Sequence, residues 1–294
     1  MPNVRKLDGV VYRETPETDV VADIYLPGED DAPEDEGDRP EEGRPAVMLM
    51  HGGGWENDHH GMLEPHLTRL TEQGYVGAEF TYRRSGQATY PAAVEDVAYG
   101  VRWLKRKRDE YGIDPDRIAI GGHSAGGHLA ALCAVSADDD ASFVPEDSGS
   151  APDDADSASE RVLDESSEVA AAIPINGLFN LEKLGQMHPS RLFVSGFLRR
   201  FFGGEYLERR DAYREASCIT HIDGNEPPFL VLAGTHDQEV PPYESMQLCD
   251  QLEHAGGDPE LLLAEGGDHF CFMEDGSHYE EGMARIEDFL DEHL

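Results

Sequence analysis

The stretch IAIGGHSAGGHLAALC, residues 118–133, decides the fold. Its first residues are an apolar run that predicts a strand, and its last residues predict a helix. The G-x-S-x-G between them is a short motif that is informative only in this context, which is the strand–turn–helix of a nucleophile elbow. Such a turn strains the backbone of the serine, requires glycines beside it, and places a helix N-terminus where negative charge develops. The pattern predicts Ser124 as a nucleophile.

A serine nucleophile needs a base to take its proton and a third group to orient that base. In an elbow of this kind the chain order is serine, acid, histidine. Asp237 follows a strong apolar run, and His269 lies in a glycine-rich loop after the next one, where parallel strands present functional groups. Glu239 lies further from the strand end, Asp268 is badly placed to hold the ring beside it, and His278 is a reserve base. We therefore predict a triad of Ser124, Asp237 and His269.

A second glycine cluster, HGGGW, begins at His51 directly after another apolar run. Serine acyl transfer needs backbone N–H donors for the oxyanion, and glycines let the amides approach without an intervening Cβ. We predict Gly53, Gly54 and Ala125 as these donors, with His51 bracing the loop by hydrogen bonds. Trp55 is predicted to bind substrate at the pocket mouth, and the alternative is that it only covers the glycine loop.

The rest of the chain alternates strand-like and helix-like segments, which predicts βαβ units and a mainly parallel sheet. Its central runs are apolar on both faces, as a sheet covered by helices requires. The early strands have no helix between them, so an antiparallel hairpin is expected at one edge. The strand-like runs are 20–26, 45–50, 76–82, 117–122, 169–175, 228–234 and 260–265. The helix-like segments are 61–74, 91–112, 124–137, 242–257 and 279–294.

Three stretches break this alternation within what we predict to be a single domain, 1–294. Residues 28–44 and 138–168 consist mostly of acids, Pro, Gly and Ser, and they are expected to be flexible, solvated loops. Residues 178–223 are rich in aromatic and arginine residues, and they are predicted to form a short helical lid inserted between two strands.

The net charge is extreme, since 61 acids face 23 bases among the 294 residues, for a formal charge of −38. Such a chain repels nucleic acid and anionic membranes. The acids are spread over the whole chain and lysine is almost absent, a composition that we interpret as adaptation to high salt. We find no transmembrane run and no secretory signal, and the four widely spaced cysteines fit reduced thiols, so a cytoplasmic location is expected.

A metal site is the weaker interpretation of the histidines that cluster near Asp58 and Glu64, because no residue is spaced to complete it; they are His59, His60 and His66. Phe193, Phe197 and Phe201 share one helix face, which either packs on the domain or walls an acyl or aryl pocket. The arginines of this region, Arg199, Arg200, Arg209 and Arg210, are expected to pair with carboxylates rather than with substrate.

Taken together, HGGGW, GHSAGGHLAAL, GTHDQEVP and GGDHF resemble the α/β-hydrolase fold over nearly the whole chain. The closest resemblance is to HGGG-bearing esterases similar to hormone-sensitive lipase, including bacterial carboxylesterases and feruloyl-esterase-like proteins. This resemblance implies the same triad and oxyanion donors, and it implies that no cofactor or metal is needed. His123 departs from the pattern, because relatives often carry Glu or Asp there.

These features predict a serine carboxylesterase for small acyl or aryl esters, acting through an acyl-enzyme on Ser124. An arylformamidase, which cleaves a formyl amide of the N-formylkynurenine type, is the first alternative. A catalytically silent binding protein on the same fold is the second, and the intact triad and glycine loop count against it. The expected partner is a small ester, and the sequence leaves open whether the protein is a monomer or a dimer.

Overall fold

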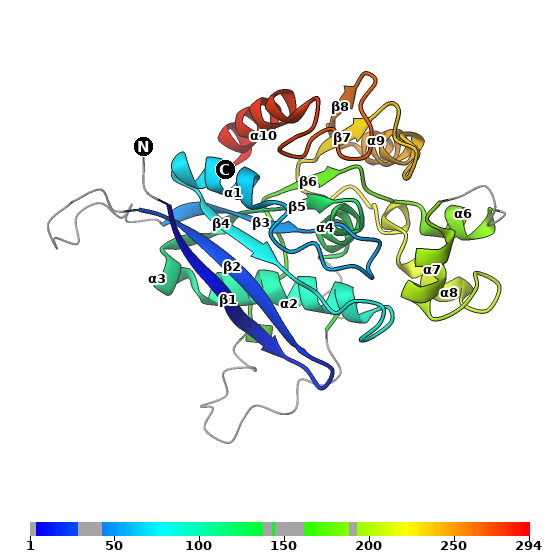
Figure 1. The fold of residues 1–294 in the computed structure, drawn as a ribbon, viewed down its shortest axis with the longest axis horizontal. Helices are drawn as coiled ribbons and strands as arrows, with labels where there is room; N and C mark the ends of the chain where they lie inside the picture. Colours follow the sequence, from blue (N-terminus) through cyan, green and yellow to red (C-terminus); the bar gives the residue numbers. More distant parts are fainter. Residues whose placement is uncertain (1–3, 29–42, 138–142, 145–161, 188–192) are drawn as a thin grey trace, which may run out of the picture.

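A computed structural model describes residues 4–28, 43–137, 143–144, 162–187 and 193–294 (Figure 1). Eight strands form one sheet in the order β1-β2-β4-β3-β5-β6-β7-β8. The pairs β1–β2 and β2–β4 are antiparallel, and the other five neighbouring pairs, including β3–β4, are parallel. The predicted, mainly parallel α/β sheet and its antiparallel edge hairpin are therefore confirmed. The strands are β1 (Val4–Glu14), β2 (Asp19–Pro27), β3 (Arg44–Met50), β4 (Val76–Phe80), β5 (Ile113–His123), β6 (Ala171–Ile175), β7 (Leu230–Gly234) and β8 (Glu260–Ala264).

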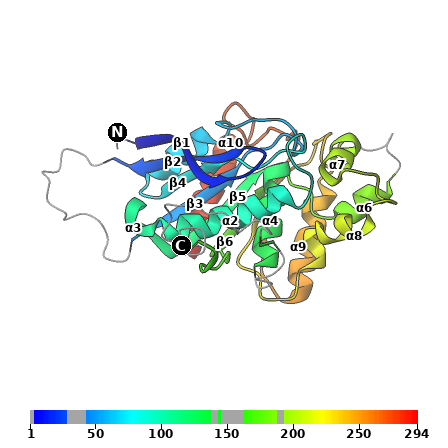
Figure 2. The same cartoon turned by 90° about the horizontal axis from the view of Figure 1, so that it is seen from below.

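Helices cover both faces of this sheet (Figures 1 and 2). Buried residues of α1 and α10 pack with one set of strand side chains, and those of α2, α4 and α9 pack with the other. The helices are α1 (Glu64–Glu72), α2 (Ala92–Arg106), α3 (Arg108–Tyr111), α4 (Ala125–Ser136), α6 (Leu181–Gln186), α7 (Ser195–Phe202), α8 (Arg210–Glu215), α9 (Tyr243–Ala255) and α10 (Tyr279–His293), with a 3₁₀ turn η2 (Cys218–Thr220).

The sheet is buried on both faces because alternate residues of each central strand are apolar on both sides. In β3, Val47 and Leu49 belong to the core under α1 and α10, whereas Met48 and Met50 belong to the core under α2 and α4. Successive side chains of a strand point to opposite faces, so an unbroken apolar run is what a doubly covered strand needs. Helix α4 is apolar on all sides except at His128 and Ser136, and every one of its residues is buried.

Parallel pairing also determines the edge of the sheet at which the predicted functional residues can lie together. β3, β5 and β6 run in the same direction, and Met50 of β3 pairs with Gly122 of β5, beside Pro174 of β6. The segments that follow these strands therefore leave the sheet at one edge. β7 and β8 continue the parallel order, so the loops after them reach the same edge.

Most of the acidic stretches 28–44 and 138–168 lies outside the described residues. The stretch 178–223 contains α6, α7 and α8, which gather at one end of the molecule, at the right of Figure 1. All four cysteines are buried and free. Among the helices of the described residues, none combines the length and the hydropathy that crossing a membrane requires.

Candidate active site

Ser124 occupies the sharp turn between β5 and α4. Its φ of 54° and ψ of −114° lie in the left-handed half of backbone space, which a non-glycine residue adopts only under constraint. The constraint comes from neighbouring strands, because Ser124 N–H donates to the Ile175 carbonyl at 2.8 Å. A Cβ at Gly122 would lie 2.5 Å from the Met50 carbonyl oxygen, and one at Gly126 would collide with the same carbonyl. The glycines of the motif are therefore required by the tight approach of β3, as the elbow predicts.

Asp237 and His269 form a buried acid–base pair beside this turn. Asp237 Oδ2 lies 2.6 Å from His269 Nδ1, and the two side chains are 1% and 5% exposed. The other carboxylate oxygen, Oδ1, accepts the N–H groups of Glu239 and Val240, both at 2.8 Å. With both oxygens occupied, the carboxylate is fixed in place and holds the imidazole in one tautomer, with Nδ1 protonated and Nε2 available as a base.

The structure also separates Asp237 from the other candidates. Glu239 lies on the opposite side of the ring, with Oε2 3.8 Å from Nε2. Asp268 is exposed and accepts the N–H of Phe270, and His278 pairs with Ser277 at the start of α10. Neither of the last two takes part in the pair.

The turn that carries Ser124 contacts His269 through the preceding residue, His123. The ring of His123 lies 4.7 Å from the ring of His269, centroid to centroid. Among the described residues, Ser124 Oγ makes no hydrogen bond to His269, so this last link of the predicted triad is open in this structure. Catalytic hydrogen bonds are often long without substrate and tighten when it binds.

The glycine loop lies directly against the nucleophile. A Cβ built on Gly52 would be 3.3 Å from the Cβ of Ser124. Gly53 and Gly54 have φ of +112° and +61°, and a Cβ on Gly53 would lie 2.5 Å from the Asn57 carbonyl oxygen. The backbone N–H groups of Gly53, Gly54 and Ala125 donate to no described residue. Gly53 and Gly54 follow Gly52 in this loop and Ala125 follows the serine, so their unused N–H groups remain the predicted donors to an oxyanion.

His51 and Tyr82 hold the start of this loop. The His51 ring stacks on the Tyr82 ring at 4.8 Å, and the Tyr82 hydroxyl donates to the His51 carbonyl at 3.0 Å. His51 Nδ1 lies 2.7 Å from the Gly52 carbonyl oxygen. Burial lowers the pKa of His51 to about 4, so the ring is neutral near pH 7 and donates this hydrogen bond from Nδ1. Its contacts agree with the predicted bracing role.

Trp55 differs from its predicted role. The indole has no exposed surface, stacks on Phe201 at 4.6 Å, and donates from Nε1 to His128 Nδ1 at 3.2 Å. Its carbonyl accepts the N–H and hydroxyl of Ser85. We therefore assign Trp55 to the support of the glycine loop, in place of the predicted contact with substrate. The physical reason is that Phe201 and His128 contact the indole, which is left with no exposed surface for a substrate.

Helix α7 packs on the glycine loop. Phe197 lies over Gly54, where a Cβ would be 2.5 Å from the ring, and Phe201 is buried against Trp55. Arg200 extends over the Phe197 ring and binds Glu56 at 2.6 Å. Arg200 is thus paired with a carboxylate, as predicted for the arginines of this region. Phe193 lies in the turn before α7 and not on the predicted helix face; its ring is 6.2 Å from the Phe197 ring and the residue is 61% exposed.

The predicted histidine cluster does not assemble into one site. His66 Nε2 donates to the Phe272 carbonyl at 3.0 Å, and His60 faces Asp23 at 3.4 Å. Within the described part of the chain, one group has metal-ligand spacing, and it is formed by Glu260, Glu292 and His293 at the surface, away from the triad. Exposed acidic groups of this kind are common without a metal.

Asn176 was not singled out from the sequence, although it touches the site. Its side chain donates to the carbonyl of His269 at 2.8 Å. The signal that could have found it is its position directly after the apolar run 169–175, the same placement that pointed to Asp237. A single asparagine at a strand end is also a common turn residue, so that signal is weak.

The comparisons with known proteins agree with this geometry. The family model BD-FAE matches residues 23–252. The chain belongs to the BD-FAE family. The predicted resemblance to esterases of the α/β-hydrolase fold is thereby confirmed.

Three relatives illustrate the family. The probable carboxylic ester hydrolase LipM and the esterase LipQ of Mycobacterium tuberculosis are each 33% identical, over 75% and 72% of this chain. The chain spans 47% and 46% of their lengths, so it covers about half of each of these relatives. Esterase 2 (Est2) of Thermogutta terrifontis, solved with propionate, is 26% identical and superposes with a TM-score of 0.71, covering 99% of this chain and 94% of Est2. Est2 has also been solved with butyrate and phosphonylated by sarin.

Proposed function

We propose that the protein is a serine carboxylesterase that hydrolyses small carboxylic esters through an acyl-enzyme on Ser124. The observation that carries this proposal is the buried Asp237–His269 pair, 2.6 Å apart, beside a serine in a strained elbow. A serine in an elbow and a carboxylate-held histidine are the parts that nucleophilic acyl transfer needs. The carboxylic acids bound to Est2, propionate and butyrate, are products of short-chain ester hydrolysis and support the same class of substrate.

In the first half-reaction, His269 Nε2 takes the proton of Ser124 Oγ as that oxygen attacks the ester carbonyl carbon. The tetrahedral intermediate collapses, the proton passes from Nε2 to the leaving alcohol, and an acyl ester of Ser124 remains. In the second half-reaction, water gives a proton to Nε2 and attacks the acyl carbon. The acid then leaves and Ser124 regains its proton. Asp237 accepts the Nδ1–H throughout and stabilises the imidazolium that forms.

The developing oxyanion is bound by the N–H groups of Gly53, Gly54 and Ala125. These donors belong to a loop and a helix N-terminus that are already fixed, so they need no rearrangement as the charge appears. Loss of one such donor typically costs about 3 kcal/mol of transition-state stabilisation.

The helices α6, α7 and α8 form the short lid in this proposal, within a single catalytic domain. Phe197 on Gly54 places an aromatic ring beside an oxyanion donor, which narrows the space for the substrate. Among the described residues of the lid, the exposed large hydrophobic side chains are Phe193 and Leu207. Two such residues do not form a long apolar surface for a lipid interface, so we expect a preference for acyl chains of roughly two to six carbons.

The test is hydrolysis of p-nitrophenyl acetate, butyrate and octanoate, with N-formylkynurenine beside them, by the wild type and Ser124→Ala. We expect the acetate and butyrate esters to be hydrolysed fastest, and Ser124→Ala to lower kcat by about a million-fold. A fluorophosphonate should label the wild type but not the variant. Ser136→Ala, at the other end of α4, is the matched control and should retain activity. Undiminished ester hydrolysis by Ser124→Ala would defeat the proposal, and faster turnover of N-formylkynurenine would favour an arylformamidase.

A further inference from the structure

The carbonyl oxygen of His269 accepts two side-chain hydrogen bonds, which the mechanism above does not use. His123 Nε2 lies 2.7 Å from this oxygen, and Asn176 Nδ2 lies 2.8 Å from it. His123 and Asn176 are each about 1% exposed, so water does not compete for either contact. The loop that carries His269 is thus held by two side chains, one from the end of β5 and one from directly after β6.

The direction of the Asn176 hydrogen bond is fixed by its surroundings. Its Oδ1 accepts the N–H of Gly234, the last residue of β7, at 2.9 Å. Its own N–H donates to the Leu232 carbonyl at 2.8 Å, and its φ of 48° places it among the few non-glycine residues in the left-handed region. Because Oδ1 is the acceptor, Nδ2 is the group that faces His269. Asn176 therefore ties β6 and β7 to the histidine loop.

The direction of the His123 hydrogen bond is also fixed, because a carbonyl oxygen can only accept. Nε2 must carry the proton, which leaves the lone pair on Nδ1, and Nδ1 has no hydrogen-bond partner among the described residues. Burial, together with the nearby His269, lowers the pKa of His123 to about 3. The ring therefore stays a neutral donor at working pH and adds no positive charge beside the imidazolium that His269 forms.

From these contacts we propose that His123 and Asn176 are positioning residues that fix the backbone of His269, so that Nε2 is aimed at Ser124. His123 is the residue before Ser124, so its hydrogen bond couples the base directly to the backbone of the nucleophile. An ionised Glu or Asp at position 123 could not donate this hydrogen bond. The inference rests on the proposed function, because it assigns the two residues to the esterase reaction.

The test compares two substitutions of similar size at one position. His123→Gln keeps an amide N–H that can reach the carbonyl, and His123→Leu keeps the bulk without a donor. Misplacing a catalytic group by about 1 Å can cost roughly 100-fold. We expect His123→Leu to lower kcat for p-nitrophenyl butyrate by about 10- to 100-fold with KM unchanged, and His123→Gln to restore most of it. His278→Leu, at a histidine that pairs with Ser277 and takes no part in the Asp237–His269 pair, is the control and should match the wild type.

A second readout needs no substrate. The Nδ1 proton between His269 and Asp237 should give a low-field proton resonance in the wild type and in His123→Gln. We expect this resonance to shift or broaden in His123→Leu and in Asn176→Asp. The Asn176→Asp variant keeps the acceptor for Gly234 but loses the donor, so it decides the question if His123→Leu does not fold.

The outcomes separate this inference from the proposed function. If the wild type hydrolyses no ester, the proposed function fails, and the resonance alone still decides whether the two residues position His269. Equal kcat in His123→Leu and His123→Gln, whether both are normal or both are reduced, would overturn the positioning role of His123. An unchanged resonance in His123→Leu and Asn176→Asp would overturn the inference as a whole.

Discussion

Asp96 and Asp237 are both carboxylates buried in the same domain, and their partners give them different uses. The Asp237 side chain is 1% exposed and is paired with one histidine. The Asp96 side chain has no exposed surface and is paired with Arg13 and Arg83. Arginine stays protonated at every working pH, so a carboxylate between two arginines can only hold charges in place. Histidine can give up and regain a proton, so the same carboxylate beside it can take part in a reaction.

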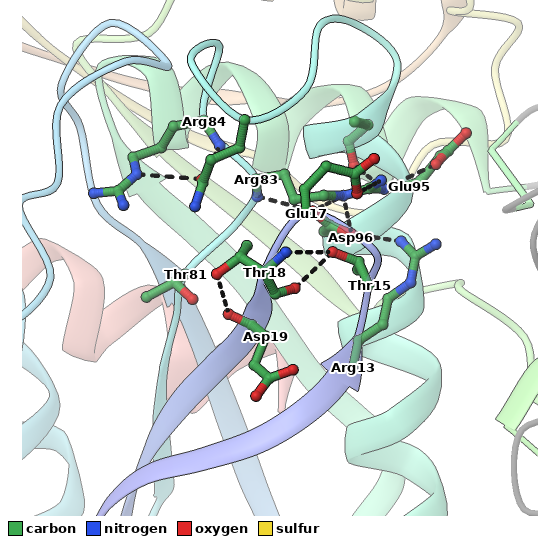
Figure 3. A network of polar contacts seen from close by, with 12 residues as sticks. Arg13, Thr15, Glu17, Thr18, Asp19, Thr81, Arg83, Arg84, Glu95 and Asp96 are labelled. Carbon is green, nitrogen blue, oxygen red and sulfur yellow. Dashed lines mark hydrogen bonds and ion pairs between the residues drawn. The ribbon is translucent and has the colours of Figure 1, made fainter. Parts of the chain in front are cut away.

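The Asp96 cluster joins three parts of the fold (Figure 3). Arg13 comes from β1, Arg83 follows β4, and Asp96 lies in α2. Arg13 Nη1 donates to Asp96 Oδ1 at 2.5 Å, and Arg83 donates to Asp96 Oδ2 from its backbone N–H at 2.8 Å and from Nε at 2.9 Å. Glu95 and Glu17 add further contacts to Arg83. The cluster thus anchors the edge hairpin of β1 and β2 to α2, the helix that packs against it. It shares no residue with the predicted triad.

The largest expected effect is on the catalytic side of this comparison. Asp237→Asn should lower kcat for ester hydrolysis by about 10⁴-fold, because the amide no longer fixes the histidine tautomer. The fold should be kept, with a melting temperature within about 3 °C of the wild type. Asp268→Asn, beside the same histidine but outside the pair, is the control and should stay within a few-fold of the wild-type kcat. A normal kcat in Asp237→Asn would remove the distinction between the two carboxylates.

The second expected effect is on stability. Asp96→Asn leaves two nearly buried arginines without their shared charge, and breaking a buried pair in this way costs about 4 kcal/mol. We expect the free energy of unfolding, measured in urea, to fall by that amount while kcat of the folded protein at 25 °C is unchanged. Glu280→Gln is the matched control, because it breaks an arginine pair in which the carboxylate is 80% exposed, which should cost less than about 1 kcal/mol. A large loss of kcat with unchanged stability would contradict this assignment.

The two clusters also differ in how much of them the sequence could predict. Asp237 and His269 each follow an apolar run in a required order, so local pattern and fold class were enough to place them together. The Arg13–Asp96 contact joins residues 83 positions apart, and nothing in the local pattern of either residue names the other. An aspartate at position 96, among the apolar residues of a helix, indicates that its carboxylate needs a partner. Only the folded structure shows which residues pair with it.

The orientation of single side chains was the other limit. The sequence placed Trp55 beside the glycine loop correctly, but the side of the loop to which an indole turns depends on backbone torsion and on α7, which is distant in the chain. The role of Asn176 could not be predicted for a similar reason, because it depends on hydrogen bonds to both Gly234 and His269. The alternation of strands and helices and the positions of the strand ends were predictable, whereas contacts made across several strand ends were not.

A third buried carboxylate, Glu79, sharpens the comparison because it forms no ion pair among the described residues. It accepts the N–H groups of Gly61 and Leu63 through Oε1, while Oε2 has no partner among the described residues. Burial raises its pKa from 4.5 to about 7; nearby Asp23 adds to the rise, and the backbone donors and Lys6 oppose it. His60, which faces Asp23, and Tyr25, whose pKa is raised by burial and by Glu79, are further titratable groups on this side. Glu79 is thus a carboxylate that the fold stabilises in its protonated form.

The smallest expected effect follows from the sign of that shift. Below pH 4.5 Glu79 is protonated in both states and contributes nothing to the pH dependence. Between pH 4.5 and about 7 the unfolded chain releases the proton while the folded chain keeps it, so stability falls as the pH rises. Above pH 7 the loss levels off at roughly 3 kcal/mol, since one pKa unit corresponds to about 1.4 kcal/mol. Glu79→Gln cannot ionise, so its stability relative to the wild type should rise by about that amount between pH 4.5 and 8, measured by urea unfolding. Glu72→Gln, an exposed residue on α1, should show no such trend. If the difference in unfolding free energy between Glu79→Gln and the wild type stays constant with pH, or falls, Glu79 is ionised in the folded protein. The N–H groups of Gly61 and Leu63 would then stabilise its charge as well as the arginines stabilise that of Asp96.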